Sequence, residues 1–327
     1  MTGGSVSWLV GAAATAFAIA LLLGPTTIAY LRRFRVGQQV RDDGPRRHQG
    51  KAGTPTMGGV LIVFAATAAT VAFAPSWRHI PYALAVMVGY GLIGLADDAL
   101  KVIYRRSLGL RAREKLLGQL ILAGVLAAYG LSDPQLGSQL RVPFSAHGWD
   151  VPGWLYVALT VAAVIGTANA VNLTDGLDGL AAGATAIASF SMAAIAWMVG
   201  NAEAALLAAA VGGACLGFSW YNAHPAQVFM GDTGSLALGA ALAAVAVLTR
   251  TQLFLLLVGG LFVVETVSVA VQVAFFRLTG GRRLLRMSPL HHHFELGGWA
   301  EPQVVTRFWL IGLVCGAVGV LALQASL

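Results

Sequence analysis

The chain has 327 residues, of which 57% are hydrophobic and only 11% are charged. Soluble globular domains carry about 25% charged residues, so the composition excludes an ordinary soluble domain and favours one integral membrane domain over residues 1–327. A net charge of +7 would suggest nucleic-acid binding in a soluble protein, but here the basic residues lie in a few loops between apolar stretches, and we expect no nucleic-acid partner.

Ten stretches are long and apolar enough, or nearly so, to cross a bilayer as helices, because a spanning helix needs about 20 mostly apolar residues. They predict an all-α, polytopic membrane fold. The ninth stretch is long and contains the pair Gly259-Gly260, where a kink or break is expected. In chain order the stretches are 8–31, 57–75, 80–100, 115–131, 153–171, 180–199, 203–222, 234–249, 252–276 and 304–325.

The Lys and Arg residues give the orientation of these spans. All but three of the 21 lie in or beside the loops that follow the first, third and ninth stretches, and the exceptions are Arg78, Arg141 and Arg250. Because basic residues favour the cytoplasmic side, these loops are predicted to be cytoplasmic and both termini to lie outside. Four polar clusters that interrupt the apolar chain all fall on this cytoplasmic side.

The first cluster, Asp97 and Asp98, ends the third stretch. Neighbouring residues on a helix point about 100° apart, so at most one of the two readily faces a shared site. Magnesium usually takes one or two carboxylates, so one aspartate could be a metal ligand or a base near a phosphate. The alternative is a solvated helix end with Lys101 as counter-ion, although acids at the membrane edge are costly and usually functional.

The second cluster spans residues 172–179 and holds Asn172, Asp175, Asp178 and Gly179. The spacing of the three polar residues would place them on one side of a helical turn. Glycine lets the backbone approach a ligand closely. A tight polar turn with local side-chain caps explains the same residue types, so both interpretations stay open.

The third cluster, residues 229–235, places Asp232 between glycines just before a span. It could begin a helix as an N-cap, and a helix start also offers free N–H groups to a phosphate. Asn222, at the end of the preceding span, could contribute to the same pocket.

The fourth cluster is the run His291, His292 and His293. Consecutive residues cannot all converge on one ion, so the run is a poor zinc motif, whereas histidines can bind phosphate or move a proton near neutral pH. Glu265 is a further acid inside the ninth stretch, and its role stays unassigned.

Together these clusters resemble the polyprenyl-phosphate N-acetylhexosamine-1-phosphate transferases, and the histidine run resembles the muramoyl-pentapeptide branch of that family. The resemblance covers nearly the whole chain. Its segments are 53–59, 97–101, 172–181, 231–235, 289–295 and 307–309.

The resemblance implies a magnesium-dependent transferase of peptidoglycan biosynthesis. It would move phospho-N-acetylmuramoyl-pentapeptide from its UDP carrier to undecaprenyl phosphate, giving lipid I and UMP. It further implies a ten-helix bundle in the bacterial inner membrane, usually a homodimer, with a cytoplasmic-side cleft. Direct attack and a phospho-enzyme on an aspartate both stay open.

The resemblance also assigns residues to this reaction. Asp232 would bind magnesium, Asp97 would be a base on the lipid phosphate with Asp98 beside it, and Phe229 would stack on uracil. The expected substrate-binding residues are Lys51, Lys115, Asn172, Asp175, Asp178, Gly179, Asn222, Phe229, His291, His292 and His293.

Two other classes of protein share some of these features. A transporter also places charges at helix breaks, but its site tends to lie near the midplane between inverted repeats. A lipid-binding scaffold needs basic loops but no clustered acids. Release of UMP from a UDP-sugar distinguishes the enzyme from both.

Overall fold

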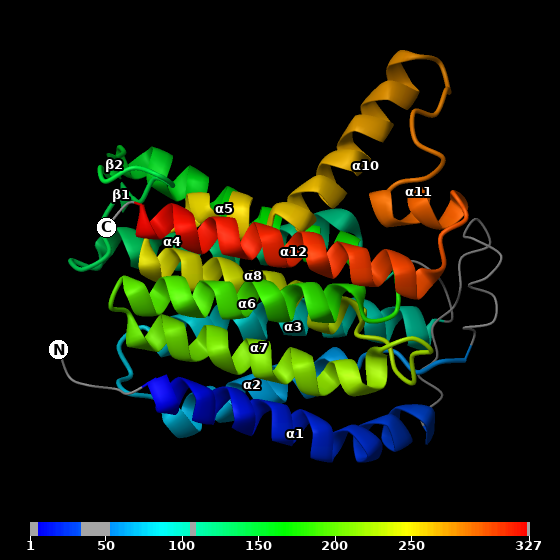
Figure 1. The fold of residues 1–327 in the computed structure, drawn as a ribbon, viewed down its shortest axis with the longest axis horizontal. Helices are drawn as coiled ribbons and strands as arrows, with labels where there is room; N and C mark the ends of the chain where they lie inside the picture. The colour runs from blue at the N-terminus through cyan, green and yellow to red at the C-terminus, as the bar shows by residue number, and fades with distance from the viewer. Residues whose placement is uncertain (1–5, 34–52, 105–108, 326–327) are drawn as a thin grey trace.

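Every stretch that the sequence predicted to cross the membrane is helical in the computed structural model, which describes residues 6–33, 53–104 and 109–325 (Figure 1). Nine helices in this part of the chain are long and apolar enough to span a bilayer, and α2, with 15 residues, is shorter. The helices are α1 (Val6–Arg33), α2 (Gly59–Phe73), α3 (Ile80–Ile103), α4 (Ala112–Ser132), α5 (Gly153–Thr174), α6 (Leu180–Met198), α7 (Ala202–Asn222), α8 (Gly231–Thr249), the 3-10 turn η2 (Gln252–Phe254), α9 (Leu255–Val258), α10 (Gly260–Leu278), α11 (Leu290–Leu296) and α12 (Glu301–Gln324). The all-α, polytopic membrane fold is therefore confirmed.

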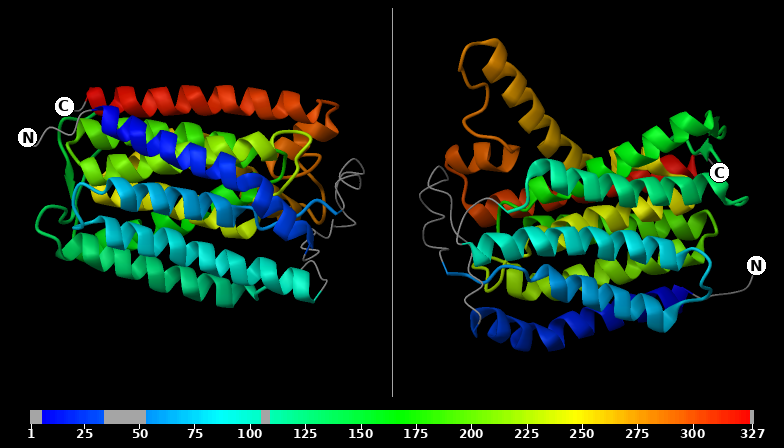
Figure 2. Two further views of the ribbon diagram at one scale, coloured as in Figure 1. Left: turned by 90° about the horizontal axis from the view of Figure 1, so that it is seen from below. Right: turned by 180° about the vertical axis from the view of Figure 1, so that it is seen from behind.

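The predicted interruption at Gly259-Gly260 is also confirmed. The stretch 252–276 is divided into η2, α9 and α10, with α9 ending at Val258 and α10 beginning at Gly260. A Cβ atom at Gly259 would lie 2.5 Å from the carbonyl oxygen of Leu255, so only glycine fits this break. Beyond the break, α10 leans away from the other helices (Figures 1 and 2).

Two small features, a pair of short strands and a short helix, were not predicted. Strands β1 (Gln139–Leu140) and β2 (Trp149–Asp150) form an antiparallel pair in which Leu140 lies opposite Trp149. Each strand has two residues, which is too short to show the alternating pattern of a strand. Helix α11 contains the histidine run and has only seven residues.

Helix α8 is the centre of the bundle, and every residue from Thr233 to Thr249 is buried. It packs against α3, α5 and α2. Glycines make these close approaches possible: a Cβ atom at Gly94 of α3 would collide with the backbone of Asp232, and one at Gly239 would lie 2.5 Å from the backbone of Ala168 in α5. The start of α8 is thus held directly against the end of α3.

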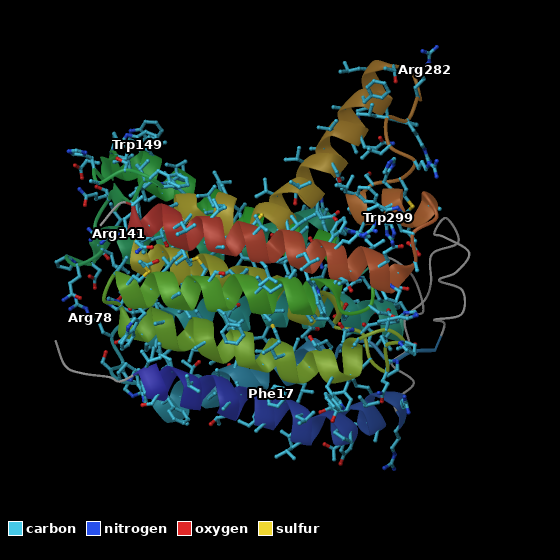
Figure 3. All side chains as sticks on the ribbon, in the orientation of Figure 1. Phe17, Arg78, Arg141, Trp149, Arg282 and Trp299 are labelled. Atoms are coloured by element: carbon cyan, nitrogen blue, oxygen red, sulfur yellow. The ribbon has the colours of Figure 1, made fainter. Side chains whose placement is uncertain are left out.

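The two ends of the bundle differ in their side chains. Trp299 and Arg282 lie at one end, near α11, whereas Arg78, Arg141 and Trp149 lie at the other (Figure 3). The contacts described next show that the polar clusters meet near the first of these ends.

Candidate active site

Three carboxylates from two helices meet where α3 ends and α8 begins. Asp97 and Asp98 are buried on α3, and Asp232 lies in the first turn of α8. One oxygen atom of each carboxylate lies within 4.8 Å of the other two. The structure therefore joins the first and third clusters of the sequence into one acidic centre.

Two lysines neutralise part of this negative charge. The Nζ atom of Lys101 lies 2.6 Å from Asp97 Oδ2 and 3.1 Å from Asp232 Oδ2. The Nζ atom of Lys115, from the first turns of α4, lies 2.7 Å from the same Asp232 oxygen. Lys101 is thus a counter-ion, as the alternative interpretation expected, but it is shared across the acidic centre and does not sit at a solvated helix end.

Asp98 differs from Asp97 in what its carboxylate contacts. It accepts hydrogen bonds from the backbone N–H groups of Asp232 (3.2 Å) and Thr233 (3.0 Å) and from the Thr233 hydroxyl (2.8 Å). These are free N–H groups at the start of α8, so Asp98 caps that helix from a neighbouring one. Asp97 instead accepts a 2.8 Å hydrogen bond from the N–H of Leu110.

Asn172 connects the second cluster to the same centre. Its side-chain amide donates to Asp232 Oδ1 at 2.8 Å and lies 2.8 Å from the Ser235 hydroxyl. Asp232 therefore receives hydrogen bonds from α3, α4 and α5, which fixes the orientation of its carboxylate.

A second polar group, which the sequence did not reveal, surrounds Asp178. His224 Nδ1 lies 2.9 Å from Asp178 Oδ2 and 3.5 Å from Glu301 Oε2. The backbone N–H of Asp178 also donates to Glu301 at 2.8 Å. His224 and Glu301 carry no motif of their own, and Glu301 looks like an ordinary acid in the first turn of α12.

Asp175 lies between these two groups, just after α5. Burial, and after it the nearby carboxylates of Asp232, Asp98 and Asp178, raise the pKa of Asp175 to about 8. Asp175 is partly exposed, and the neighbouring negative charges raise its pKa just as burial does. A cationic group or ligand placed here would reverse that effect.

Asn222 and Phe229 shape the loop between α7 and α8. Asn222 accepts a 3.1 Å hydrogen bond from the N–H of Gly179, whose φ is +80°, and donates to the carbonyl of Val228 at 2.9 Å. Phe229 is partly buried, and its N–H donates to the carbonyl of Pro55 at 2.8 Å. Asn222 therefore connects the second cluster to this loop through hydrogen bonds.

The three histidines have three different partners. His291 Nδ1 lies 3.2 Å from Glu265 Oε2, and both side chains are fully buried. His292 lies 3.2 Å from Glu295. The ring of His293 accepts a hydrogen bond from the backbone N–H of Arg286 at 3.1 Å.

His291 also brings α11 to the second cluster. Its Nε2 atom is buried and has no hydrogen-bond partner in the part of the chain that the structure describes, and a Cβ atom at Gly176 would collide with it. The glycine thus lets the imidazole reach the 172–179 turn. Glu265, unassigned from the sequence, holds the other ring nitrogen and so fixes the direction of the ring.

The oxygen atoms of Asp97, Asp98 and Asp232 form a donor set that suits a hard divalent cation. Both oxygens of Asp98 accept hydrogen bonds from the start of α8. Asp97 and Asp232 instead contact Lys101, so these two carboxylates already share one cation. The arrangement can therefore bind a metal ion, and its lysines can hold anionic oxygen atoms. Lys51, the remaining predicted residue, lies outside the described residues.

Comparison with known proteins shows the family of the chain. The glycosyl transferase family 4 profile matches residues 80–250, and phospho-N-acetylmuramoyl-pentapeptide-transferase signature 1 matches residues 51–63. Proteins named phospho-N-acetylmuramoyl-pentapeptide-transferase from Desulforudis audaxviator, Desulforamulus reducens and Moorella thermoacetica are 52%, 50% and 53% identical to the chain. These matches cover 96%, 98% and 92% of this chain and 97%, 96% and 94% of the respective relatives. The chain therefore belongs to the phospho-N-acetylmuramoyl-pentapeptide-transferase family.

Proposed function

We propose that the protein transfers phospho-N-acetylmuramoyl-pentapeptide from its UDP carrier to undecaprenyl phosphate in peptidoglycan biosynthesis. An oxygen atom of the lipid phosphate forms a new bond to the phosphorus that carries the sugar, and the bond to UMP breaks, so UMP and lipid I are the products. The observation that carries the proposal is the acidic centre with its two lysines, Lys101 and Lys115, at one end of a membrane bundle. Full-length similarity to relatives named for this reaction supports it.

Magnesium is the metal that we propose for the acidic centre, with Asp232 as its ligand and the oxygens of Asp97 and Asp98 within reach. When bound, it would neutralise negative charge on the diphosphate, which is the main demand of phosphoryl transfer. Asn172 holds the Asp232 carboxylate in place from α5. Lys101 and Lys115 are then available to phosphate oxygens.

Asp97 is our candidate for the base on the lipid phosphate. A phosphate monoester loses its second proton with a pKa of about 6, so part of the acceptor still carries that proton near neutral pH. The Leu110 N–H and Lys101 hold the two oxygens of Asp97 in a fixed direction. Asp98 supports the reaction indirectly by holding the start of α8, and with it Asp232.

The nucleotide-sugar is proposed to lie along the second cluster, between the acidic centre and α11. The residues assigned to it are Lys51, Lys115, Asn172, Asp175, Asp178, Gly179, Asn222, Phe229, His291, His292 and His293. Contacts of Asn172 with Asp232 and of His291 with the Gly176 turn bring these clusters together and support this arrangement. Phe229 is proposed to stack on the uracil ring.

The proposal is tested by offering the purified protein different UDP-sugars together with undecaprenyl phosphate and magnesium. UDP-N-acetylmuramoyl-pentapeptide is expected to release UMP, and UDP-N-acetylglucosamine is expected to release little. UMP release from the second donor alone would assign the chain to another sugar specificity. No UMP release from any donor would favour a transporter or a lipid-binding scaffold.

We further propose that the acidic centre faces the cytoplasm, in the inner membrane of a bacterium, with both termini outside. The distribution of basic residues supports this orientation. A cysteine at Gly297, beside α11, should be protected in intact cells from a thiol reagent that does not cross the membrane. A cysteine at the exposed Ala146, between β1 and β2, is the matched control and should react. The reverse pattern would overturn the orientation.

The proposed homodimer rests on the resemblance to the family alone. The mass of the purified protein in a lipid nanodisc, measured by light scattering, tests it. A mass of one chain per particle across the working concentration range would contradict a dimer.

A further inference from the structure

A cavity of about 470 Å³ opens at the end of the bundle opposite the acidic centre. The loops around it join α2 to α3, α4 to α5 and α6 to α7, and the end of α8 completes the wall. Arg78, Arg141 and Arg250 all line this cavity, together with His79. These arginines are the three basic residues that lie outside the cytoplasmic loops, and Figure 3 shows Arg78 and Arg141 at this end.

Two acidic residues beside the cavity, Asp133 and Glu203, already have partners in the fold. Asp133 pairs with Arg78 at 3.0 Å. Burial opposes ionisation of Asp133, but the Gln135 N–H and Arg78 outweigh it and lower the pKa of Asp133. Glu203 accepts hydrogen bonds from the backbone N–H groups of Arg78 (3.3 Å), His79 (2.6 Å) and Ile80 (2.9 Å) and so caps the start of α3.

Arg141 and Arg250 are left without an acidic partner among the described residues. The N–H of Arg141 donates to the carbonyl of Arg250 at 2.8 Å, which holds the two residues side by side. The Nε atom of Arg141 is buried and has no hydrogen-bond partner there. Burial and the charge of Arg250 both lower the pKa of Arg141. Both arginines are partly exposed, but two like charges held side by side in one cavity repel each other, and a bound anion would relieve this repulsion.

The chemistry of the cavity favours a phosphate group. Guanidinium groups present a planar fork of donors that binds phosphate oxygens in pairs. Exposed tryptophans also lie at this end: Trp149 is labelled in Figure 3, Trp77 lies in the loop between α2 and α3, and Trp154 lies at the start of α5. Tryptophan concentrates at the membrane–water interface, so these side chains place the cavity near the level of lipid headgroups.

We propose that Arg141 and Arg250, with Arg78 beside them, bind the phosphate group of an anionic phospholipid in the leaflet opposite the acidic centre. Free phosphate shares this chemistry and is the second possible source. The site stands apart from the transfer reaction and does not rest on the function proposed above.

The test measures thermal unfolding of the detergent-purified full chain as a function of ligand concentration. The probes are phosphatidylglycerol and phosphatidylcholine in mixed micelles, and inorganic phosphate at constant ionic strength. The variants are Arg141→Gln/Arg250→Gln, the charge-preserving Arg141→Lys, and Arg282→Gln, which removes an exposed arginine at the opposite end. UMP release by the double variant serves as the check that it is folded.

Phosphatidylglycerol is expected to stabilise the wild type more than phosphatidylcholine. The double variant should bind it about tenfold more weakly or worse, because hydrogen bonds to charged groups are among the strongest in proteins. Arg141→Lys should be intermediate and Arg282→Gln unchanged. Stabilisation by inorganic phosphate with the same dependence on arginine would support the anion site and identify free phosphate as its source. Equal responses of the wild type and the folded double variant to every probe would overturn the proposal.

Discussion

The Thr233 hydroxyl donates a 2.8 Å hydrogen bond to the carboxylate of Asp98, and this contact joins the end of α3 to the start of α8. Asp97, one residue earlier, faces Lys101 and the N–H of Leu110 instead. The two adjacent aspartates therefore have different contacts. Asp98 holds the helix that carries Asp232, and Asp97 is the residue that we propose as the base on the lipid phosphate.

Replacing Asp98 with Asn should lower the free energy of unfolding by about 1–3 kcal/mol, because the amide loses the charge that the start of α8 binds. Thermal unfolding in detergent measures this loss. Asp150→Asn, an exposed acid in β2, is the control and should leave stability nearly unchanged. An unchanged melting temperature for Asp98→Asn would show that the cap contributes little.

Asp97→Asn should reduce turnover strongly while UDP-sugar binding stays close to that of the wild type. A base on the lipid phosphate acts mainly in the transition state, so its loss appears in kcat more than in substrate affinity. Single-turnover UMP release and equilibrium binding of the nucleotide-sugar measure the two quantities separately. Loss of binding with normal turnover of the bound substrate would make Asp97 a binding residue.

Glu265→Gln should reduce activity through His291, because the glutamate fixes one ring nitrogen of that histidine. The double variant Glu265→Gln/His291→Ala should then be no less active than His291→Ala alone, since the effects of substitutions at two contacting residues do not simply add. Thr266→Val is the control on the same helix, because the Thr266 hydroxyl donates to the carbonyl of Phe262 within that helix. Additive losses would separate Glu265 from the function of His291.

Asp175→Asn should change how stability depends on pH in the absence of magnesium. The pKa of Asp175 is raised to about 8, whereas that of an aspartate in the unfolded chain is about 4. Its stabilising contribution is therefore complete below about pH 4 and is lost as pH rises through about 8. The wild type should therefore lose thermal stability relative to Asp175→Asn between pH 5 and pH 9. Parallel curves for the two proteins over that range would contradict the raised pKa.

The sequence predicted the spans well because hydropathy over about 20 residues is a strong local signal. It also placed Asp97 and Asp232 at the same side of the membrane, since the orientation of successive spans alternates. It could not pair Asp98 with Thr233 or Glu265 with His291, because those contacts depend on which helices are neighbours. The packing around α8, and the glycines that permit it, determine which helices are neighbours.

Other features carried too little local signal. His224 reaches Asp178 from the loop after α7 and Glu301 from the first turn of α12, and neither lies in a recognisable motif. The strands β1 and β2 are too short for a periodic pattern. Arg141 and Arg250 appeared in the sequence only as exceptions to the basic-residue pattern, and their shared cavity requires the fold.

Formation of lipid I by the wild type and by Asp232→Asn, with and without magnesium, tests the central claim most directly. The carboxylate of Asp232 is held by Asn172, Lys101 and Lys115, so replacing it with an amide should leave a folded protein with no magnesium-dependent product. The wild type should make lipid I and UMP in equal amounts, and only with magnesium present. Near-native lipid I formation by Asp232→Asn, with unchanged dependence on magnesium, would contradict the account.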